Sequence, residues 1–383
     1  MFTTPRAVVR INGFSVDDIK EYSYTSDLLQ LGDPFSFTVP NIGGKYTKAN
    51  SKTVIQRGAS VQFYIADPAV QQGNLVLKAT GLVISRERFN NHDGSSVRVT
   101  CADLGWHLNN NSAPLWMNLR GHTYRSLAEK LIDPSWGFQG TREGNSLNRR
   151  LKKGRFELLQ ELTPNLLTVM PRIQVEPGEQ ISETLIRYAK RLPALLNVSG
   201  DGWFQIFQPN YTQAASYQIQ LHEPTDPRSK TNNIKDAHEV LTIEPQFNDV
   251  VCVGTQVYPP VIQDHAVLNP NQLQFVGREK RTIYPFRRYM TFSDPEPLTT
   301  AQARTRARWR ANRGDFDAEQ WTYTVAGHSQ NGVFWETDTI VAVNDSVNDI
   351  YGNFYVSAVS YSSTRGNGSE TRITVRLPNK LVV

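Results

Sequence analysis

One pattern occurs twice in this 383-residue chain, once near each end, and it constrains the fold more than any other feature. Residues 60–102 and 338–378 share an alternating strand pattern that ends in Asp, a short loop with Gly, a long strand pattern and a polar turn. After the turn the two copies read Gly-Ser-Ser-Val-Arg-Val-Thr from Gly94 and Gly-Ser-Glu-Thr-Arg-Ile-Thr from Gly368. Alternation of apolar and polar residues is typical of strands with one buried face. The pattern predicts two related antiparallel β-barrel units in one chain, with ordinary strand and turn chemistry as the alternative source of the match.

Most of the remaining chain also has strand patterns separated by turn residues, and three segments have helical periodicity instead. These segments lie near residues 122–132, 182–192 and 300–312. Thr123 is a suitable N-cap for the first of them. The predicted fold class is therefore α+β and mainly antiparallel β.

The order of these patterns divides the chain into three regions. Residues 1–104 are predicted to form the first β-barrel domain. Residues 105–245 are predicted to form an intermediate α+β region that holds the first two helices. Residues 246–383 are predicted to form the second β-barrel domain, with an inserted segment near residues 257–320. A chain of this length is expected to contain more than one hydrophobic core.

Composition excludes several classes of protein. The 41 basic and 36 acidic residues give a net charge of only +5, which does not favour a dedicated nucleic-acid-binding protein. The only two cysteines, Cys101 and Cys252, lie in apolar strand patterns and are expected to be buried free thiols of a protein that folds in a reducing compartment. The N-terminus is not expected to be a signal peptide, and no apolar run approaches the ~18 residues of a membrane helix.

Motifs of enzymes and cofactor sites are absent from the sequence. It has no Gly-x-x-x-x-Gly-Lys-[Ser/Thr] loop, no His-Glu-x-x-His motif and no Gly-x-Ser-x-Gly elbow, and its seven histidines are scattered. We therefore predict no catalytic residue, no cofactor and no metal site. Glu157, Glu161 and Glu183 are the carboxylates to test for a glycosidase pair, although solvation at the surface explains them better.

The segment near residues 300–312 is the strongest candidate for an interaction site. At about 100° per residue, Ala303, Ala307 and Ala311 share one helical face. The candidate interface residues flank this face and are Arg304, Arg306, Arg308 and Arg310. Three interpretations remain open for the arginines: pairing with nearby carboxylates such as Asp315 and Asp317, docking of another subunit, or contact with nucleic-acid phosphates. The basic run at residues 149–155 is interpreted as a solvated loop, with a polyanion-binding patch as the alternative.

Several short segments, in this order along nearly the whole chain, resemble one family of phage proteins. These segments are residues 9–13, 33–37, 80–85, 99–104, 124–132, 178–192, 201–202, 301–309, 323–328 and 374–378. They resemble the baseplate hub proteins of contractile-tailed phages, namely the Mu-type hub and late control protein D group. The first half of type VI secretion spike proteins has the same architecture. The basic run at residues 149–155 has no counterpart that we can place in this family.

The resemblance implies a homotrimer whose chains each contain two tube-like β-barrels and smaller intermediate domains. Such a protein lies at the centre of the baseplate and joins the hexameric tail tube to the trimeric central spike. Its lumen passes the genome during ejection. The implied partners are the tube or tube-initiator protein, the spike protein and a tape-measure protein, with DNA present only in passage and no membrane anchor.

This assembly has a geometric basis in the duplicated pattern. Three copies of a chain with two similar barrels present six similar barrels in a ring, because closed homo-oligomers obey rotational symmetry. The sequence therefore predicts a structural baseplate hub in the virion, assembled in the host cytoplasm, and not an enzyme. A tail-associated cell-wall hydrolase and, behind it, a DNA-binding protein that uses the arginine-rich helix are the alternatives.

Overall fold

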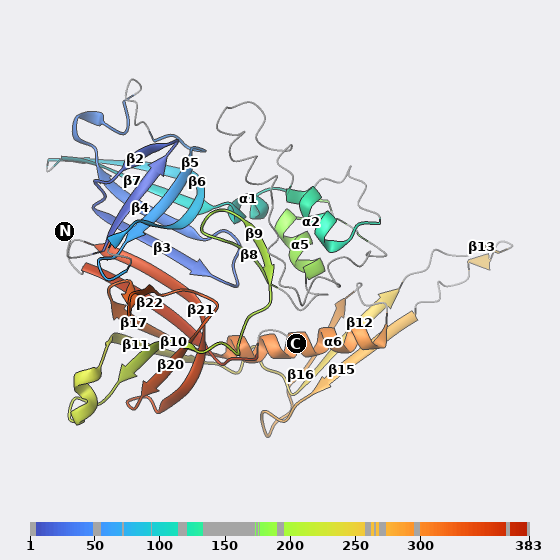
Figure 1. Cartoon of the computed structure of the whole chain (residues 1–383). Coiled ribbons are helices and arrows are strands. Elements are labelled where there is room, and N and C mark those ends of the chain that lie inside the picture. Colours follow the sequence, from blue (N-terminus) through green and yellow to red (C-terminus); the bar gives the residue numbers. More distant parts are fainter. Residues whose placement is uncertain are drawn as a thin grey trace. The chain divides into compact units, whose positions relative to one another are not determined.

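The computed structural model describes residues 5–48, 55–70, 73–92, 94–113, 121–132, 173, 175, 177–189, 195–256, 262–263, 266–267, 273–294, 299–364 and 368–380. The predicted helix near 182–192 is thus described only to residue 189, and Glu157, Glu161 and the basic run at 149–155 lie outside the described residues. The chain divides into two compact units (Figure 1). Unit 1 comprises Met1–His238 and Thr322–Val375, and unit 2 comprises Glu239–Trp321 and Arg376–Val383.

A 13-stranded, mainly antiparallel sheet contains most strands of the chain. Its N-terminal strands are β1 (Arg6–Ile11), β2 (Phe14–Val16), β3 (Glu21–Asp27), β4 (Pro34–Pro40), β5 (Ser60–Ala66), β6 (Val76–Asn91) and β7 (Gly94–Asp103). The other strands are β10 (Ala215–Leu221), β11 (Ile234–Leu241), β17 (Glu319–Ala326), β20 (Thr339–Asp345), β21 (Ile350–Thr364) and β22 (Gly368–Arg376). The prediction of a mainly antiparallel β protein is confirmed.

The two sets of strands follow the same order in the sheet. The order β3-β4-β7-β6-β5-β1 in the first set corresponds to β11-β17-β22-β21-β20-β10 in the second, and the matching strands also follow one another in the same order along the chain. The two sets differ in the direction of one strand: β1 pairs with β5 antiparallel, whereas the corresponding β10 pairs with β20 parallel. Among the described residues neither set closes into a barrel: β3 pairs with β21, so that one continuous sheet runs through both sets.

The repeated sequence pattern forms the same meander in each set. Residues 60–102 lie in β5, β6 and β7, and residues 338–378 lie in β20, β21 and β22, with a long middle strand in both cases. The turn glycines Gly94 and Gly368 both have positive φ, at 135° and 72°, which side chains disfavour. The local match in the sequence therefore corresponds to a local match in structure.

A buried histidine joins the two sets of strands within unit 1. The Nε2 atom of His328 lies 2.8 Å from the hydroxyl of Tyr22 on β3, and its Nδ1 atom lies 3.0 Å from the hydroxyl of Thr371 on β22. The ring also makes an edge contact with Tyr361 on β21, at 5.1 Å between centroids. Burial lowers the pKa of His328 to about 4, so the ring is neutral at pH 7.

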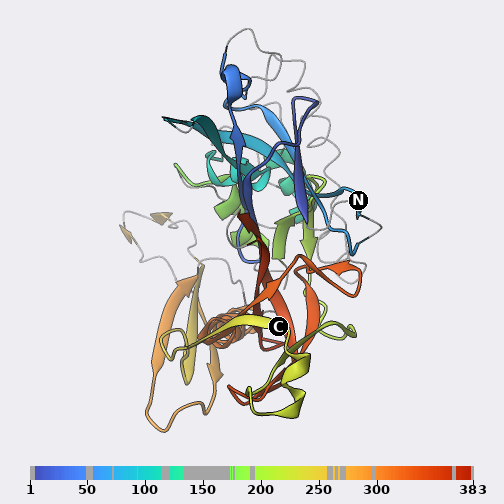
Figure 2. The same cartoon turned by 90° about the vertical axis from the view of Figure 1, so that its left-hand side faces the viewer.

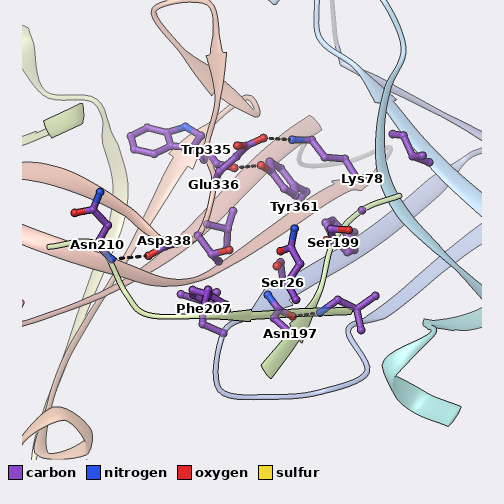
Figure 3. Close-up of a pocket in the computed structure, with 18 of the residues that line it drawn as sticks. Ser26, Lys78, Asn197, Ser199, Phe207, Asn210, Trp335, Glu336, Asp338 and Tyr361 are labelled. Atoms are coloured by element: carbon purple, nitrogen blue, oxygen red, sulfur yellow. Dashed lines mark hydrogen bonds and ion pairs between the residues drawn. The ribbon is translucent and has the colours of Figure 1, made fainter. Parts of the chain in front are cut away.

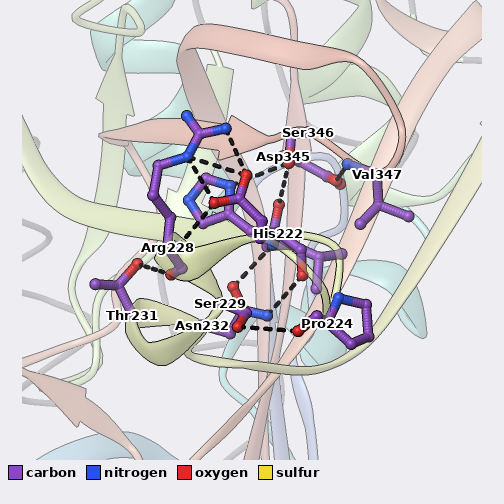
Figure 4. A network of polar contacts seen from close by, with 11 residues as sticks. His222, Pro224, Arg228, Ser229, Thr231, Asn232, Asp345, Ser346 and Val347 are labelled. Carbon is purple, nitrogen blue, oxygen red and sulfur yellow. Dashed lines mark hydrogen bonds and ion pairs between the residues drawn. The ribbon is translucent and has the colours of Figure 1, made fainter.

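A polar network fixes the turn after β20 (Figure 4). One carboxylate oxygen of Asp345 accepts the backbone N–H groups of Val347 and Asn348. The Nδ1 atom of His222, just after β10, lies 3.0 Å from the hydroxyl of Ser346. The side-chain amide of Asn232 donates to the carbonyl oxygen of His222 at 2.9 Å. The network ties the ends of β10 and β20 together.

A small helical cluster follows β7 in unit 1. It contains α1 (Gly105–Asn109), α2 (Tyr124–Ile132), α5 (Ile181–Ala189) and the hairpin of β8 (Leu195–Val198) and β9 (Phe204–Phe207). The hydroxyl of Thr123 accepts the backbone N–H of Ser126 at 3.1 Å at the start of α2. Leu127, Leu185 and Phe204 are among the residues of its apolar core. Short elements elsewhere are η1 (Ile42–Gly44), η5 (Pro227–Thr231), β18 (Ser329–Gln330) and β19 (Val333–Phe334).

Unit 2 is built on a three-stranded sheet and one long helix (Figure 2). The sheet has the order β15-β12-β16, from β12 (Asp249–Gln256), β15 (Leu273–Lys280) and β16 (Tyr289–Asp294), and the helix is α6 (Thr300–Ala318). The two-residue strands β13 (Ile262–Gln263) and β14 (Ala266–Val267) pair separately. Unit 2 thus includes the segment near 257–320 that the sequence marks as an insertion.

Both cysteines are buried free thiols, as predicted. Cys101 lies on β7 and Cys252 lies on β12. Burial raises the pKa of the Cys252 thiol to about 11, which keeps it protonated and unreactive at neutral pH. In the part of the chain that the structure describes, no helix has the length and apolar character needed to cross a membrane.

Candidate functional site

Helix α6, which carries the candidate arginines, begins at a side-chain cap. The hydroxyl of Thr299 accepts the backbone N–H of Gln302 at 3.2 Å and so satisfies one of the free donors at the helix start. The predicted alanine face is confirmed, because Ala303, Ala307 and Ala311 are all buried. They pack against Val250 and other apolar residues of the sheet.

Small residues on both elements allow the helix to approach the sheet closely. A Cβ atom added at Gly277 on β15 would overlap the backbone of Ala303 and Arg304. Position 277 therefore has to be glycine for α6 to lie where it does. The alanines provide the matching surface on the helix, since larger side chains would hold the helix away from the sheet.

The four candidate arginines have different environments on α6. The Nε atom of Arg306 donates to Oδ2 of Asp294 at 2.6 Å, and the two side chains of this ion pair are only 11% and 8% exposed. Arg308 Nε lies 3.6 Å from a carboxylate oxygen of Glu279 and is exposed. Arg304 and Arg310 are exposed and have no ion-pair partner among the described residues. Arg306 is therefore held within unit 2, whereas the three exposed arginines could contact another molecule.

The two carboxylates that the sequence suggested as partners pair with other basic residues. Asp315 lies within ion-pair distance of Arg281 and of Lys380. Asp317 pairs with Arg313 at 2.7 Å and with Arg376 at 3.1 Å. The suggested pairing of the helix's arginines is therefore confirmed for Arg313 with Asp317. It does not hold for Arg306 and Arg308, whose carboxylates come instead from β16 and β15.

Replacing Arg306 with alanine is expected to destabilise unit 2 by about 3 kcal/mol, because Asp294 would lose its cation in a buried position. Arg304→Ala is the matched control on the same helix, and we expect it to change the free energy of unfolding by less than about 0.5 kcal/mol. Urea unfolding of both variants measures the difference. Equal effects of the two substitutions would contradict the structural role of Arg306.

Of the three carboxylates that the sequence suggested for a glycosidase pair, only Glu183 lies among the described residues. Glu183 accepts the backbone N–H of Gln180 at 3.0 Å, so it caps the start of α5. Among the described residues no cluster of three or more His, Cys, Asp or Glu side chains could hold a metal ion.

Sequence reasoning missed a polar pocket of unit 1 that contains Lys78, Glu336 and Asp338. Lys78 and Glu336 form an ion pair although 258 positions separate them in the chain. No local signal in the sequence could have connected them, because Lys78 lies on β6 and Glu336 lies in the segment between β19 and β20.

Comparisons with solved structures match the whole chain to phage tail proteins. A tail protein from Neisseria meningitidis aligns with a TM-score of 0.73 and 18% identity over 99% of this chain and 98% of its own. A 43 kDa tail protein of prophage MuSo2 from Shewanella oneidensis aligns with a TM-score of 0.70 and 19% identity over 98% of this chain and 99% of its own. This chain has the fold of phage tail proteins.

The tail-protein fold extends to type VI secretion. An E. coli component of that system, described as structurally similar to the T4 bacteriophage tail proteins gp27 and gp5, aligns with a TM-score of 0.56 and 10% identity. The alignment covers 98% of this chain and 78% of that one. No protein-family model and no curated protein sequence matches the chain. The expected likeness to tail and spike proteins is thus confirmed by structure.

Proposed function

We propose that this chain is the structural hub of a phage tail baseplate. Its fold matches tail proteins over nearly the full length of both chains, which supports a role for the whole chain in a tail. In this proposal three copies join the hexameric tail tube to the trimeric central spike and line the channel for the genome. The protein would be located in the virion tail after assembly in the host cytoplasm.

The observation that carries this proposal is the repeated strand order within one chain. The order β3-β4-β7-β6-β5-β1 matches β11-β17-β22-β21-β20-β10, so one chain holds two similar sets of strands. Three chains would then present six similar sets of strands around a threefold axis and could meet a sixfold tube on one side. We propose that the first set of strands is the tube-like barrel of residues 1–104. The second barrel would combine the strands β17, β20, β21 and β22 of residues 246–383 with β10 and β11, which come from the predicted intermediate α+β region of residues 105–245.

Exposed strands at the ends of the sheet support assembly. β11 ends the strand path of the large sheet and exposes Val240 and Leu241. Unpaired edges with apolar side chains are prone to aggregation unless a neighbour covers them. In the proposed trimer such edges would be covered by adjacent copies, and the exposed Arg304, Arg308 and Arg310 on α6 would be available for docking.

The proposal predicts a mass of three chains in complex with a trimeric spike protein. Light scattering after size-exclusion chromatography, on the chain alone and mixed with the spike, measures this directly. A chain that stays monomeric in the presence of the spike would count against the hub. A zymogram on peptidoglycan tests the hydrolase alternative, for which the comparisons give no support, and a clear zone would favour it.

A further inference from the structure

A pocket of about 490 Å³ lies in unit 1 where distant parts of the chain meet (Figure 3). Leu77 and Lys78 at the start of β6 line one side of it. Residues of the β8–β9 hairpin and of the segment after it, between positions 197 and 213, line another side. Residues 335–338 before β20 and residues of β3 and β21 complete the lining. Both sets of strands therefore contribute to one cavity.

One ion pair in the pocket is already complete. The Nζ atom of Lys78 lies 3.0 Å from a carboxylate oxygen of Glu336, and it also lies 4.1 Å from the ring centroid of Phe334. The Lys78 side chain is 7% exposed, whereas that of Glu336 is 58% exposed. The buried Lys78 thus neutralises the charge of Glu336 from the protein interior, while the Glu336 carboxylate still faces solvent.

A second carboxylate in the same pocket has no cation. Asp338 accepts the hydroxyl of Tyr355 at 2.7 Å and the backbone N–H of Asn210 at 3.3 Å. Both donors are neutral, and no Lys, Arg or His of the described chain forms an ion pair with Asp338. Burial raises the pKa of Asp338, as expected for a carboxylate without a compensating charge. The lining therefore contains two carboxylates and one cation.

The rest of the lining is rich in groups that both donate and accept hydrogen bonds. Five residues of the lining have carboxamide side chains: Asn197, Gln205, Gln208, Asn210 and Gln213. The oxygens of Asn197 and Asn210 and the nitrogen of Gln213 already hydrogen bond within the chain. Carboxamides match the alternating N–H and C=O groups of an extended peptide. The tyrosines Tyr24 and Tyr361 are buried and stack on each other with 3° between their planes, so they offer no free aromatic face to a sugar ring.

We propose that this pocket binds an arginine or lysine side chain carried by an extended segment of a partner protein. The cation would lie against Asp338 and the second oxygen of Glu336. The remaining donors and acceptors of the carboxamides would hydrogen bond to the peptide backbone beside it. An ion pair with a carboxylate that is already partly desolvated is stronger than one at the surface. The identity of the partner as a tail protein rests on the proposed function, whereas the chemistry of the pocket does not.

Isothermal titration calorimetry of the full chain with two short peptides tests the proposal. The probes are acetyl-Gly-Ser-Arg-Ser-Gly-amide and the same peptide with citrulline, which has nearly the shape of arginine without its charge. The arginine peptide is expected to bind about tenfold more tightly than the citrulline peptide. Asp338→Asn, which keeps the hydrogen-bond acceptor, is expected to abolish this difference, and Glu223→Gln, an exposed carboxylate outside the pocket, is expected to leave it unchanged.

Glu336→Gln gives a second variant in the pocket, so that a folding defect of Asp338→Asn alone would not decide the result. Its thermal unfolding is measured as well, because Lys78 would lose its ion-pair partner. This variant is also expected to weaken binding of the arginine peptide. Equal binding of the two peptides, or binding of neither, would overturn the proposal. Trimer formation with the spike is measured separately, so a failure of the peptide experiment would not contradict the hub proposal. If instead the trimer did not form but the pocket bound the arginine peptide selectively, the hub proposal would fail and the pocket proposal would hold.

Discussion

Gly277→Ala is expected to destabilise unit 2 by at least about 3 kcal/mol. The added methyl group would overlap backbone atoms of Ala303 and Arg304, which cannot move aside as a flexible side chain can. Helix α6 would have to shift away from β15, and the buried contacts of its alanine face with Val250 would be lost as well. Urea unfolding and limited proteolysis within residues 239–321 measure the loss.

Val276→Ala is the control for this prediction. Val276 precedes Gly277 on β15, faces away from the helix and is 49% exposed, so the same new residue meets no backbone there. We expect a change of less than about 1 kcal/mol. If Gly277→Ala were as mild as this control, α6 would not lie against β15 as described.

The contact between α6 and the sheet shows which features of the fold the sequence predicts and which it does not. The alanine face follows from helical spacing, because positions four apart share one side of a helix. The sequence also predicts the two meanders, since alternation and turn residues are local signals. It does not predict that Gly277 lies under Ala303, because nothing local indicates which surface a helix covers.

The sequence could not predict the ion-pair partners of Arg306 and Arg308, because it does not indicate which strands lie beside the helix. Asp315 and Asp317 are near the candidate arginines in the chain, but Arg306 pairs with Asp294 and Arg308 with Glu279. Ion pairs depend on distance in space, and the strands β15 and β16 pass beside the helix. The pocket that contains Lys78 and Asp338 could not be predicted either, because its lining residues come from segments that are far apart in the chain.

His328→Gln is expected to reduce the loss of stability in acid. Burial lowers the pKa of His328 to about 4 from an ordinary value near 6.5. Between these two values the unfolded chain binds more protons at this position than the folded chain does, so the free energy of unfolding falls as the pH falls from about 6.5 to 4. The shift corresponds to about 3 kcal/mol of stability that is present above pH 6.5 and lost near pH 4.

The measurement is the difference in free energy of unfolding between the wild type and His328→Gln at several pH values. Comparing the two proteins is necessary because other buried groups change the free energy of unfolding with pH in the opposite direction to His328. Burial raises the pKa of Asp103 to about 7 and that of its neighbour Asp33 well above its usual range, so these carboxylates favour the folded state as the pH falls. Their contribution is the same in both proteins and cancels in the difference. A constant difference between pH 4 and 7 would mean that His328 is not buried as a neutral ring between Tyr22 and Thr371, and that the joint between the two sets of strands is built differently.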